Sequence, residues 1–514
     1  MQGFSTGDAA IPTVEQLIAR QNGSFLQLTH REIPGTSVRI KRHAPRRERE
    51  AYKQLKEGEV DPEAFCDDTV ASWTGYIDTI DGKSLFFFFF ESRSNPEKDP
   101  VVFWTNGGPG GSSALGLFME LGPCRVPLEH REGAPINGTV HFEYSWNNRA
   151  NVIFVEQPAS EKKNGGVGYS YRRFGPPVST TDQAAVDVYH FLRIFFSAFD
   201  KFKDNDFHLA GESYGGHYIP RFATEVMDRN QRVTDAARKA GEKPDESKLI
   251  NLKSIVLGNP IVDNLDQRFS FYSVACTKQA GYGRPRLPIS TCKQVYQDTQ
   301  RCMINIKKYC YDSFSETDCR AHHEYCEDHV GWGVWVDQFH LNPYDASDDC
   351  KAGFEPDLCY AESGAIARYL DREDVRSLLG ARSRNESGTY AVSSSEVAEN
   401  FQASFDALRS SKQYVAGLLE RDLRVLVYVG SYDVVCNWIG NLEWVNNLEY
   451  EGAIDFKKGL TGWMEGGKEV GLTATGGNLT YATVTGAGHM VPFKKHHAKS
   501  ALAMINRWLD GQSL

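Results

Sequence analysis

The chain contains 514 residues, of which 41% are hydrophobic and 24% are charged, a composition typical of a folded globular protein and not of a disordered one. Its formal net charge of -10 at pH 7 argues against nucleic acid as a partner, because nucleic-acid binding requires a basic surface. The longest apolar run, around Leu85 to Phe90, is far shorter than the roughly 18 residues that span a bilayer, so we expect no membrane partner.

The eleven cysteines indicate disulfide bonds. Eight of them lie between Cys276 and Cys359, whereas Cys66, Cys124 and Cys436 are scattered. No two cysteines have the C-x2-4-C spacing of a structural zinc site, so we expect no metal, and the odd number leaves at least one thiol unpaired.

Disulfides fit an oxidising secretory route, with the culture medium or the vacuole as the destination. The first 25 residues contain no apolar core of a signal peptide, so we expect the chain to begin after a cleaved leader or to lack its first residues. Four N-glycosylation sequons fit the same route, and they begin at Asn22, Asn137, Asn385 and Asn478.

In chain order, residues 1–65 are polar and include a basic stretch from Arg39 to Arg49, which we interpret as a solvated surface arm in preference to a processing or binding site. Strand signals follow from Trp73 onward. Two strands are joined by a turn at Asp81-Gly82, and short apolar runs occupy residues 100–105 and 150–158. A helix then begins after Thr180, where Gln183 completes a capping box and apolar residues recur at helical spacing.

The alternation continues with strands at 206–211 and 252–260, separated by a helix from about Gly216. It stops over residues 267–415, which carry the cysteine cluster, and resumes with strands at 423–430 and 479–486 and a helix from about Lys495 to Leu509. Alternation on both sides of an insertion predicts one parallel-type sheet, built from residues 66–266 and 416–514, with a cap formed by residues 267–415.

The first chemical motif is G-x-S-x-G at residues 211–215, centred on Ser213. The pattern is short and occurs by chance, and a glycine-rich turn with an inert serine is the alternative. Here, however, it lies directly between a predicted strand and a predicted helix, where a sharp turn lifts the serine hydroxyl above the sheet.

A nucleophilic serine needs a base and an orienting acid, which α/β-hydrolases place downstream in the order acid, then histidine. Asp433 follows the strand at 423–430, and His489 follows the strand at 479–486. Asp422, His496 and His497 are rivals by residue type, but Asp422 precedes its strand and the histidine pair stands at a helix start.

Acyl transfer also requires donors for the oxyanion. The glycine-rich loop at residues 106–111 (NGGPGG) directly follows a predicted strand, where this fold supplies one backbone N–H, and the N–H of Tyr214 would be the second. A plain turn or a phosphate-binding loop are the alternatives, but the Lys-Ser/Thr of a Walker motif is missing.

Several segments, in this order, resemble the serine carboxypeptidases (peptidase family S10), and the match extends from about Trp73 to Leu509. The G-G-S-S variant, with G-P-C nearby, resembles most the fungal carboxypeptidase S1 branch. The segments are WTNGGPGGSSALGLFMELGPC, SWNN, NVIFVEQP, GESYGGHYIP, DVVCNWIGN and GAGHMVPF.

This resemblance implies an α/β-hydrolase fold with a mixed, mostly parallel central sheet and an inserted, disulfide-rich, mainly helical cap. It implies a serine-type carboxypeptidase without a cofactor that releases single residues from peptide and protein C-termini through an acyl-enzyme, with highest activity at acidic pH. By the resemblance Ser213 is the nucleophile, His489 the general base, Asp433 its orienting acid, and Gly108 and Tyr214 the oxyanion donors.

The resemblance also assigns recognition of the substrate's α-carboxylate to Asn106, the Gly107 N–H, Glu120 and Glu212. A protonated glutamate donates a hydrogen bond to a carboxylate, whereas an ionised one repels it. We therefore predict that the KM for peptides rises between about pH 5 and pH 8, with a smaller effect on esters.

Leu115, Met119 and Met490 would form an apolar wall for the departing residue, and we expect a preference for hydrophobic C-terminal residues. The resemblance places Cys436 in the substrate pocket as the unpaired cysteine. Many members of the family have a cysteine at the position of Gly111. This chain therefore has no disulfide from the glycine-rich loop to the cap, and we expect Cys66 to pair with Cys124 instead.

Residues 160–165 (SEKKNG) are inserted relative to the family pattern, near the active-site face, where they could alter access. Two other functions use the same scaffold. An acyltransferase is disfavoured by the retained carboxylate-binding residues, and a non-catalytic binding protein is disfavoured by the intact triad.

Overall fold

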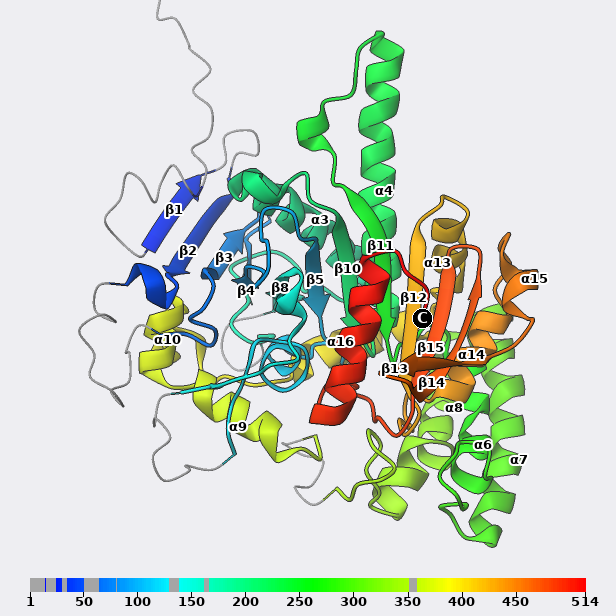
Figure 1. The fold of residues 1–514 in the computed structure, drawn as a ribbon. Coiled ribbons are helices and arrows are strands. Elements are labelled where there is room, and N and C mark those ends of the chain that lie inside the picture. Colours follow the sequence, from blue (N-terminus) through cyan, green and yellow to red (C-terminus); the bar gives the residue numbers. More distant parts are fainter. Residues whose placement is uncertain are drawn as a thin grey trace, which may run out of the picture.

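The computed structural model describes Val14 and residues 25–29, 35–49, 64–79, 81–128, 138–160, 166–350 and 358–514. At its centre lies one large sheet (Figure 1). Its strands are β1 (Phe25–Thr29), β2 (Ser37–His43), β3 (Ser72–Asp78), β4 (Lys83–Phe90), β5 (Val101–Thr105), β8 (Asn151–Val155), β9 (Tyr171–Arg172), β10 (Phe207–Glu212), β11 (Leu252–Gly258), β12 (Arg424–Gly430), β13 (Thr461–Glu465), β14 (Lys468–Gly476) and β15 (Leu479–Val484).

The strands of this sheet lie in the order β1-β2-β3-β4-β8-β5-β10-β11-β12-β15-β14-β13, and β9 pairs with β4. The middle strands, from β8 to β15 in this order, are parallel to one another. The strands on both flanks pair antiparallel, so the sheet is mixed, with a parallel centre. A separate short hairpin pairs β6 (Cys124–Arg125) with β7 (Val140–His141).

Helices cover both faces of the sheet. The helix expected after Thr180 is α3, whose first turn is capped by the Thr180 hydroxyl, while the side chain of Gln183 accepts a hydrogen bond from the Ser179 N–H. The helices of the described residues are α3 (Thr181–Ala198), α4 (Gly215–Ala240), α5 (Asn264–Phe269), α6 (Phe271–Cys276), α7 (Ile289–Ile306), α8 (Glu316–His329), α9 (Ala361–Leu370), α10 (Glu373–Leu379), α11 (Arg384–Ser387), α12 (Ser395–Ala403), α13 (Lys412–Leu419), α14 (Trp438–Asn446), α15 (Ala453–Phe456) and α16 (Lys495–Leu509).

The phenylalanine run of β4 is explained by burial on both sides of the sheet. Phe87 and Phe89 pack in one core cluster with α3 and α4, whereas Phe86, Phe88 and Phe90 pack in the other, with α9, α10 and α16. Successive residues of a strand point to opposite faces, so a strand covered on both faces needs a continuous apolar run.

The N-terminal region differs from the solvated arm that we expected. Residues Ser37–His43 form β2, which pairs with β3 along its whole length, and Val38 and Ile40 are buried. Arg39, which stands between them, lies over the Tyr76 ring and forms an ion pair with Asp78. Val38 and Ile40 do alternate as in a strand, but basic residues surround them, so the sequence did not predict this strand.

The segment between β11 and β12, which we call the insert, carries helices α5 to α13 and most of the disulfides. In Figure 1 its helices α6–α8 lie on one side of the molecule and α9–α10 on the other. The bonds Cys276–Cys292, Cys302–Cys326, Cys310–Cys319 and Cys350–Cys359 lie within it.

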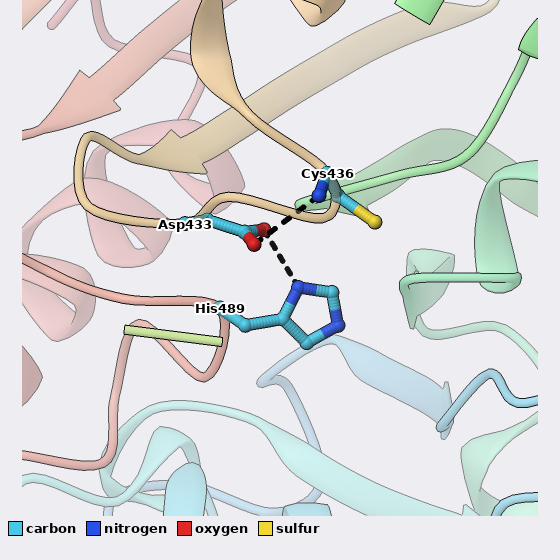
Figure 2. A group of neighbouring side chains, drawn as sticks. All are labelled: Asp433, Cys436 and His489. Carbon is cyan, nitrogen blue, oxygen red and sulfur yellow. Dashed lines mark hydrogen bonds and ion pairs between the residues drawn. The ribbon is translucent and has the colours of Figure 1, made fainter. Parts of the chain in front are cut away.

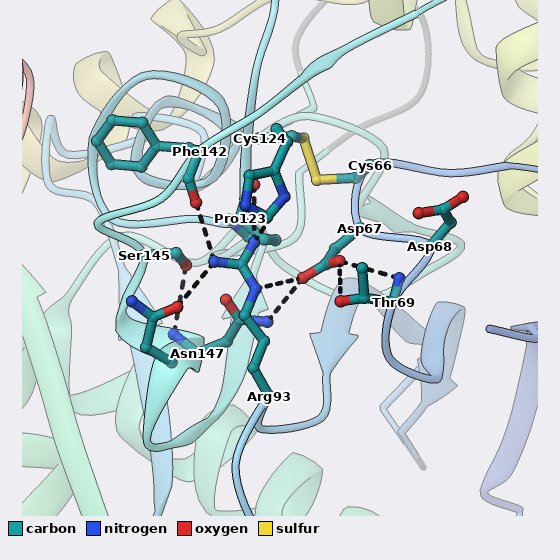
Figure 3. A network of polar contacts seen from close by, with 12 residues as sticks. Cys66, Asp67, Asp68, Thr69, Arg93, Pro123, Cys124, Phe142, Ser145 and Asn147 are labelled. Carbon is teal, nitrogen blue, oxygen red and sulfur yellow. Dashed lines mark hydrogen bonds and ion pairs between the residues drawn. A yellow bond between two sulfur atoms is a disulfide. The ribbon is translucent and has the colours of Figure 1, made fainter. Parts of the chain in front are cut away.

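The expected pairing of Cys66 with Cys124 is also confirmed, and Cys436 is the free, buried cysteine. Figure 3 shows a polar network beside the Cys66–Cys124 bond. Arg93 donates to Asp67 at 2.7 Å and to the carbonyl of Phe142 at 2.9 Å, and thereby ties the end of β4 to the segment that carries the disulfide.

One hairpin was not predicted from the sequence. β13 and β14 extend the sheet beyond β15, although β13 is mostly exposed and contains Gly462 next to Trp463. Among the described residues every helix is too short or too polar to cross a bilayer.

Candidate active site

Ser213 lies in the tight turn between β10 and α4. Its backbone has a φ of +61°, a strained conformation for a non-glycine residue, and its N–H donates to the carbonyl of Gly258 at 3.0 Å. Glycines are required around it, because a Cβ on Gly216 would lie 2.3 Å from the carbonyl oxygen of Ile261. The turn therefore presents a half-buried serine at the end of the sheet, as the motif predicts.

Asp433 and His489 form a hydrogen-bonded pair (Figure 2). Nδ1 of His489 lies 2.6 Å from Oδ2 of Asp433, and both residues are buried. Asp433 follows β12 and His489 follows β15, and these strands are parallel neighbours, so the two loops meet at the same edge. The rivals are elsewhere: Asp422 precedes β12, and His496 stands in the first turn of α16.

The insert supports the histidine from the other side. The N–H of His489 donates to the carbonyl of Tyr344 at 2.6 Å, and the Tyr344 ring lies 5.2 Å from the imidazole, centroid to centroid. The position of the imidazole therefore depends on the insert as well as on β15.

Sequence reasoning missed Asn259, a second partner of the acid. Its Nδ2 donates to Oδ2 of Asp433 at 2.7 Å, and its Oδ1 accepts from the N–H of Gly430 at 3.3 Å. Its position in the sequence could have marked it as a site residue, because it directly follows β11, at the edge of the sheet where Ser213 and Asp433 also follow their strands.

Burial raises the pKa of the Cys436 thiol and the Ser213 hydroxyl lowers it by a smaller amount, so the two side chains are neighbours. Within the part of the chain that the structure describes, no hydrogen bond joins Ser213 to His489. Such bonds are often long in ligand-free enzymes and shorten when substrate binds.

Asp433, Cys436 and His489 are residue types that bind metals, and their potential ligand atoms lie within 4.8 Å of one another. Burial, and then the charge of Asp433, raise the pKa of the Cys436 thiol well above its usual value, so the thiol keeps its proton. Metal-binding cysteines are deprotonated, and Nδ1 of His489 is already bonded to Asp433. The group fits proton transfer better than metal binding.

The glycine-rich loop lies against the serine turn. A Cβ on Gly107 would be 2.3 Å from the backbone N of Tyr214, and Gly108 has a φ of +110°. Tyr214 precedes the first residue of α4, where backbone N–H groups have no intrahelical acceptor. The glycine-rich loop therefore lies in direct contact with Ser213 and Tyr214, where an oxyanion hole would have to lie.

The four residues assigned to carboxylate binding are gathered next to this loop. Nδ2 of Asn106 lies 3.0 Å from Oε1 of Glu120 and 3.4 Å from Oε1 of Glu212. Both glutamates are buried, and the Oε2 atom of each has no hydrogen-bond partner among the described residues. Burial, and then the charge of Glu120, raise the pKa of Glu212 well above its usual value.

The predicted pocket residues are mostly in the core. Leu115, Met119 and Met490 belong to one buried cluster with the sheet, and Met119 directly precedes Glu120. One cavity lies beside the acid loop and is lined by Val434, Val435 and aromatic residues of the insert; another lies beside Pro109 and Tyr214. The ion pair of Arg268 with Glu327 borders them.

The sequons differ in setting. Asn385 is exposed on α11, and Asn478 is half-buried at the turn between β14 and β15. Asn22 and Asn137 lie outside the described residues, as does the inserted segment 160–165 apart from Ser160.

A parallel sheet with a serine turn after β10, an acid after β12 and a histidine after β15 defines an α/β-hydrolase. Among solved structures, the Saccharomyces cerevisiae prohormone-processing carboxypeptidase Kex1(Δ)p shares this fold, with a TM-score of 0.67, 20% identity and 92% of each chain covered.

The family model for serine carboxypeptidases matches residues 62–511. Carboxypeptidase Y homolog A of Blastomyces gilchristii is 39% identical over 470 residues, covering 90% of this chain and 78% of that protein. The vacuolar serine-type carboxypeptidase ATG42 of Saccharomyces cerevisiae is 36% identical over 465 residues, covering 88% and 82%.

The chain therefore belongs to the serine carboxypeptidase family and is a hydrolase of that class. The expected family and fold are confirmed. The relatives reported above are named for carboxypeptidase Y and not for carboxypeptidase S1, so the closer likeness to the S1 branch stays a prediction.

Proposed function

We propose that this enzyme releases single residues from the free C-termini of peptides and proteins through an acyl-enzyme on Ser213. The observation that carries the proposal is the direct adjacency in sequence and space of Ser213 and Glu212, which joins the nucleophile to a buried carboxylate-binding cluster. An endopeptidase or a lipase would have no use for such a cluster at this point.

In the proposed mechanism, Nε2 of His489 takes the proton of the Ser213 hydroxyl as its oxygen attacks the last peptide bond. Asp433 holds Nδ1 of the imidazole and stabilises the imidazolium that forms. The N–H groups of Gly108 and Tyr214 stabilise the oxyanion. His489 then protonates the leaving amine, and water hydrolyses the acyl-enzyme by the same steps in reverse order.

Asn106, the Gly107 N–H, Glu120 and Glu212 would bind the α-carboxylate of the substrate. Asn106 is oriented for this role, because its Oδ1 accepts from the Trp104 indole at 2.8 Å and from the Gly116 N–H at 3.0 Å, which leaves its Nδ2 directed at the glutamates. A shared proton between the two glutamates makes the cluster a donor for an incoming carboxylate.

This arrangement supports activity at acidic pH. Because the pKa of Glu212 is raised, the protonated form that donates to the substrate is favoured at low pH. As the pH rises through the pKa of the pair, the second charge appears and repels the substrate carboxylate, so the KM for peptides rises while an ester without a free carboxylate is less affected.

The preference for hydrophobic C-terminal residues rests on Leu115, Met119 and Met490, which are apolar and close in sequence to Glu120 or His489. We propose the secretory route, with the vacuole or the medium as destination, on the strength of the five disulfides.

The test is hydrolysis of blocked dipeptides between pH 4 and pH 8, with a free or an amidated C-terminus, before and after a serine-directed phosphonylating reagent. We expect release from the free acid, loss of activity after labelling of Ser213, and a flat KM–pH profile in Glu212→Gln. Glu225→Gln on α4 is a matched control, since that carboxylate is buried but paired with Arg229. Equal rates on acid and amide, or a wild-type profile in Glu212→Gln, would contradict the proposal.

A further inference from the structure

The oxyanion loop, residues 106–113, is rich in glycine. Gly108 and Gly110 have φ values of +110° and +88°, and most neighbouring positions are also glycine or serine. Within the loop, the N–H of Gly111 donates to the carbonyl of Gly107 at 2.8 Å. Glycine has the largest conformational freedom of any residue, so we expect that contacts from outside the loop are also needed to fix the Gly108 N–H.

Part of this support is backbone pairing with the end of the insert. Gly111 forms an antiparallel bridge with Ser393. The N–H of Ser112 donates to the carbonyl of Val392 at 2.8 Å, and the N–H of Ser394 donates to the carbonyl of Gly110 at 2.9 Å. The loop thus runs beside residues 390–394 for a short distance.

The rest is a buried triangle of oxygen atoms. Oε1 of Glu156, which directly follows β8, lies 2.9 Å from the Ser112 hydroxyl and 2.9 Å from the Tyr390 hydroxyl. The two hydroxyls are 2.7 Å apart. Oε2 of Glu156 accepts the N–H of Ser113 at 3.3 Å, and all these side chains are fully or almost fully buried.

Three close oxygen pairs need three hydrogens, and the two hydroxyls supply only two. If Glu156 is ionised, one pair in the triangle brings lone pairs together without a hydrogen between them. If Glu156 is protonated, its hydrogen completes a ring in which each oxygen donates once and accepts once. Gly168 packs against this carboxyl, and a Cβ there would be 2.3 Å from it, so water has no room to supply the missing hydrogen from that side.

The charges around the triangle agree with a neutral Glu156. Burial raises the pKa of Glu156 to about 7. The hydrogen bonds from Tyr390, Ser112 and Ser113 lower this pKa, but their effect is smaller than that of burial. Three other ionisable groups lie nearby. The Tyr169 ring lies 4.7 Å from that of Tyr390, Arg376 stacks on Tyr169, and Asp371 pairs with Arg376 and accepts the N–H of Tyr390 at 2.8 Å. None of them makes a direct contact with the carboxyl that the structure describes.

We propose that Glu156 and Tyr390 are positioning residues for the oxyanion loop: through Ser112 they hold the Gly108 N–H beside the N–H of Tyr214, and the ring that does so is complete only while Glu156 carries a proton. This inference rests on the proposed roles of Gly108 and Tyr214 as oxyanion donors. Neither Glu156 nor Tyr390 touches the reacting atoms.

The first test is Tyr390→Phe in the full-length enzyme, assayed at pH 5 with a blocked dipeptide. We expect kcat to fall about tenfold while KM stays within about twofold, because a displaced donor weakens binding of the transition state more than binding of the substrate. Removing an oxyanion donor altogether would lower kcat further. Tyr369→Phe is the matched control, a buried tyrosine of the insert whose ring packs on Phe118. A wild-type kcat in Tyr390→Phe would overturn the proposal.

The second test separates positioning from mere stability. A glutamine at 156 has a carbonyl for the Ser113 N–H and one amide hydrogen for each of Ser112 and Tyr390, so Glu156→Gln keeps a hydrogen in all three pairs at every pH. Its amide nitrogen accepts none, so one hydroxyl hydrogen loses its acceptor without a pair of facing lone pairs being created. We expect wild-type kcat at pH 5 and no decline of kcat between pH 6 and pH 8 on saturating ester substrate, whereas wild type declines and Glu156→Ala is slow throughout.

An unchanged alkaline decline in Glu156→Gln would refute the role of the proton even if Tyr390→Phe failed to fold. The proposed function is checked in the same experiment. A wild-type enzyme that neither hydrolyses the dipeptide nor reacts with the phosphonylating reagent contradicts the proposed function, whereas an active wild type with unaltered variants contradicts only the positioning role.

Discussion

Asn259 offers a prediction that can be worked through from the structure. Its Nδ2 donates to the same oxygen of Asp433 that holds His489, at 2.7 Å, in a fully buried setting. Asn259→Gly removes this donor and the acceptor for the Gly430 N–H. Glycine is the appropriate replacement because the φ of Asn259 is +40°, and alanine there would add about 1 kcal/mol or more of backbone strain.

A hydrogen bond to a charged group contributes about 1.5–3 kcal/mol, which corresponds to a factor of roughly 10 to 150. We expect the free energy of unfolding to fall by an amount in this range. In addition, we expect kcat to fall about tenfold with little change in KM, because Asp433 must stay fixed against His489 when the imidazolium forms.

The assay is steady-state hydrolysis of a blocked dipeptide at pH 5, together with urea unfolding. Asn205→Gly is the control: Asn205 is buried and its amide also donates to backbone carbonyls, those of Pro96 and Asp99, but far from the site, so stability should fall without loss of kcat. If Asn259→Gly lost stability but kept wild-type kcat, Asn259 would be structural only and the reasoning would be refuted.

Three further predictions concern other parts of the site. Gly107→Ala should lower kcat about 100-fold, as for a lost oxyanion donor, because the new Cβ meets the backbone of Tyr214 and Glu212. Gly417→Ala on α13, where the new Cβ would meet only the Arg421 side chain at an ordinary 3.6 Å, should leave kcat unchanged, and equal values for both would contradict this. The pKa of Glu156 is about 7 in the folded state, against an ordinary 4.5. Between these pH values the folded protein holds a proton that the unfolded chain has released, so the free energy of unfolding should fall by up to roughly 3 kcal/mol as pH rises from 4.5 to 7. Urea unfolding of Glu156→Gln at the same pH values should lack this fall. The buried, protonated thiol of Cys436 should react slowly with iodoacetamide but bind mercurials, and Cys436→Ser should abolish mercurial inhibition; persisting sensitivity would show that another group is responsible.

The placement of Ser213, Asp433 and His489 at one edge of the sheet could be predicted from local rules. Each lies within five residues after a strand, and the ends of neighbouring parallel strands meet at one edge. Strand β4 could be predicted in the same way, because burial on both faces requires a continuous run of apolar residues. In such cases adjacent residues in the sequence are sufficient for the prediction.

Contacts between distant segments left no comparable signal. Ser112 and Tyr390 lie 278 residues apart, and neither belongs to a motif that predicts the other. Asn259 is a single asparagine after a strand, with nothing in the sequence to pair it with Asp433. β2 was obscured for a different reason, because Val38 and Ile40 alternate with arginine and lysine and the charge dominated the pattern.

The insert leaves the sheet after β11 and returns at β12, and these strands are hydrogen-bonded neighbours. Parallel strands begin and end at opposite edges of a sheet, but the chain comes back before it enters β12: the N–H of Ser411 donates to the carbonyl of Val262 at 2.9 Å. Residues 262–411 therefore have their ends close together, and a change in their length would be inexpensive, since doubling a loop costs only about 0.6 kcal/mol in closure entropy. The helices from α6 to α8 could thus be replaced as a block. Tyr344 and residues 390–394 must stay, because Tyr344 holds the N–H of His489 and residues 390–394 hold the oxyanion loop.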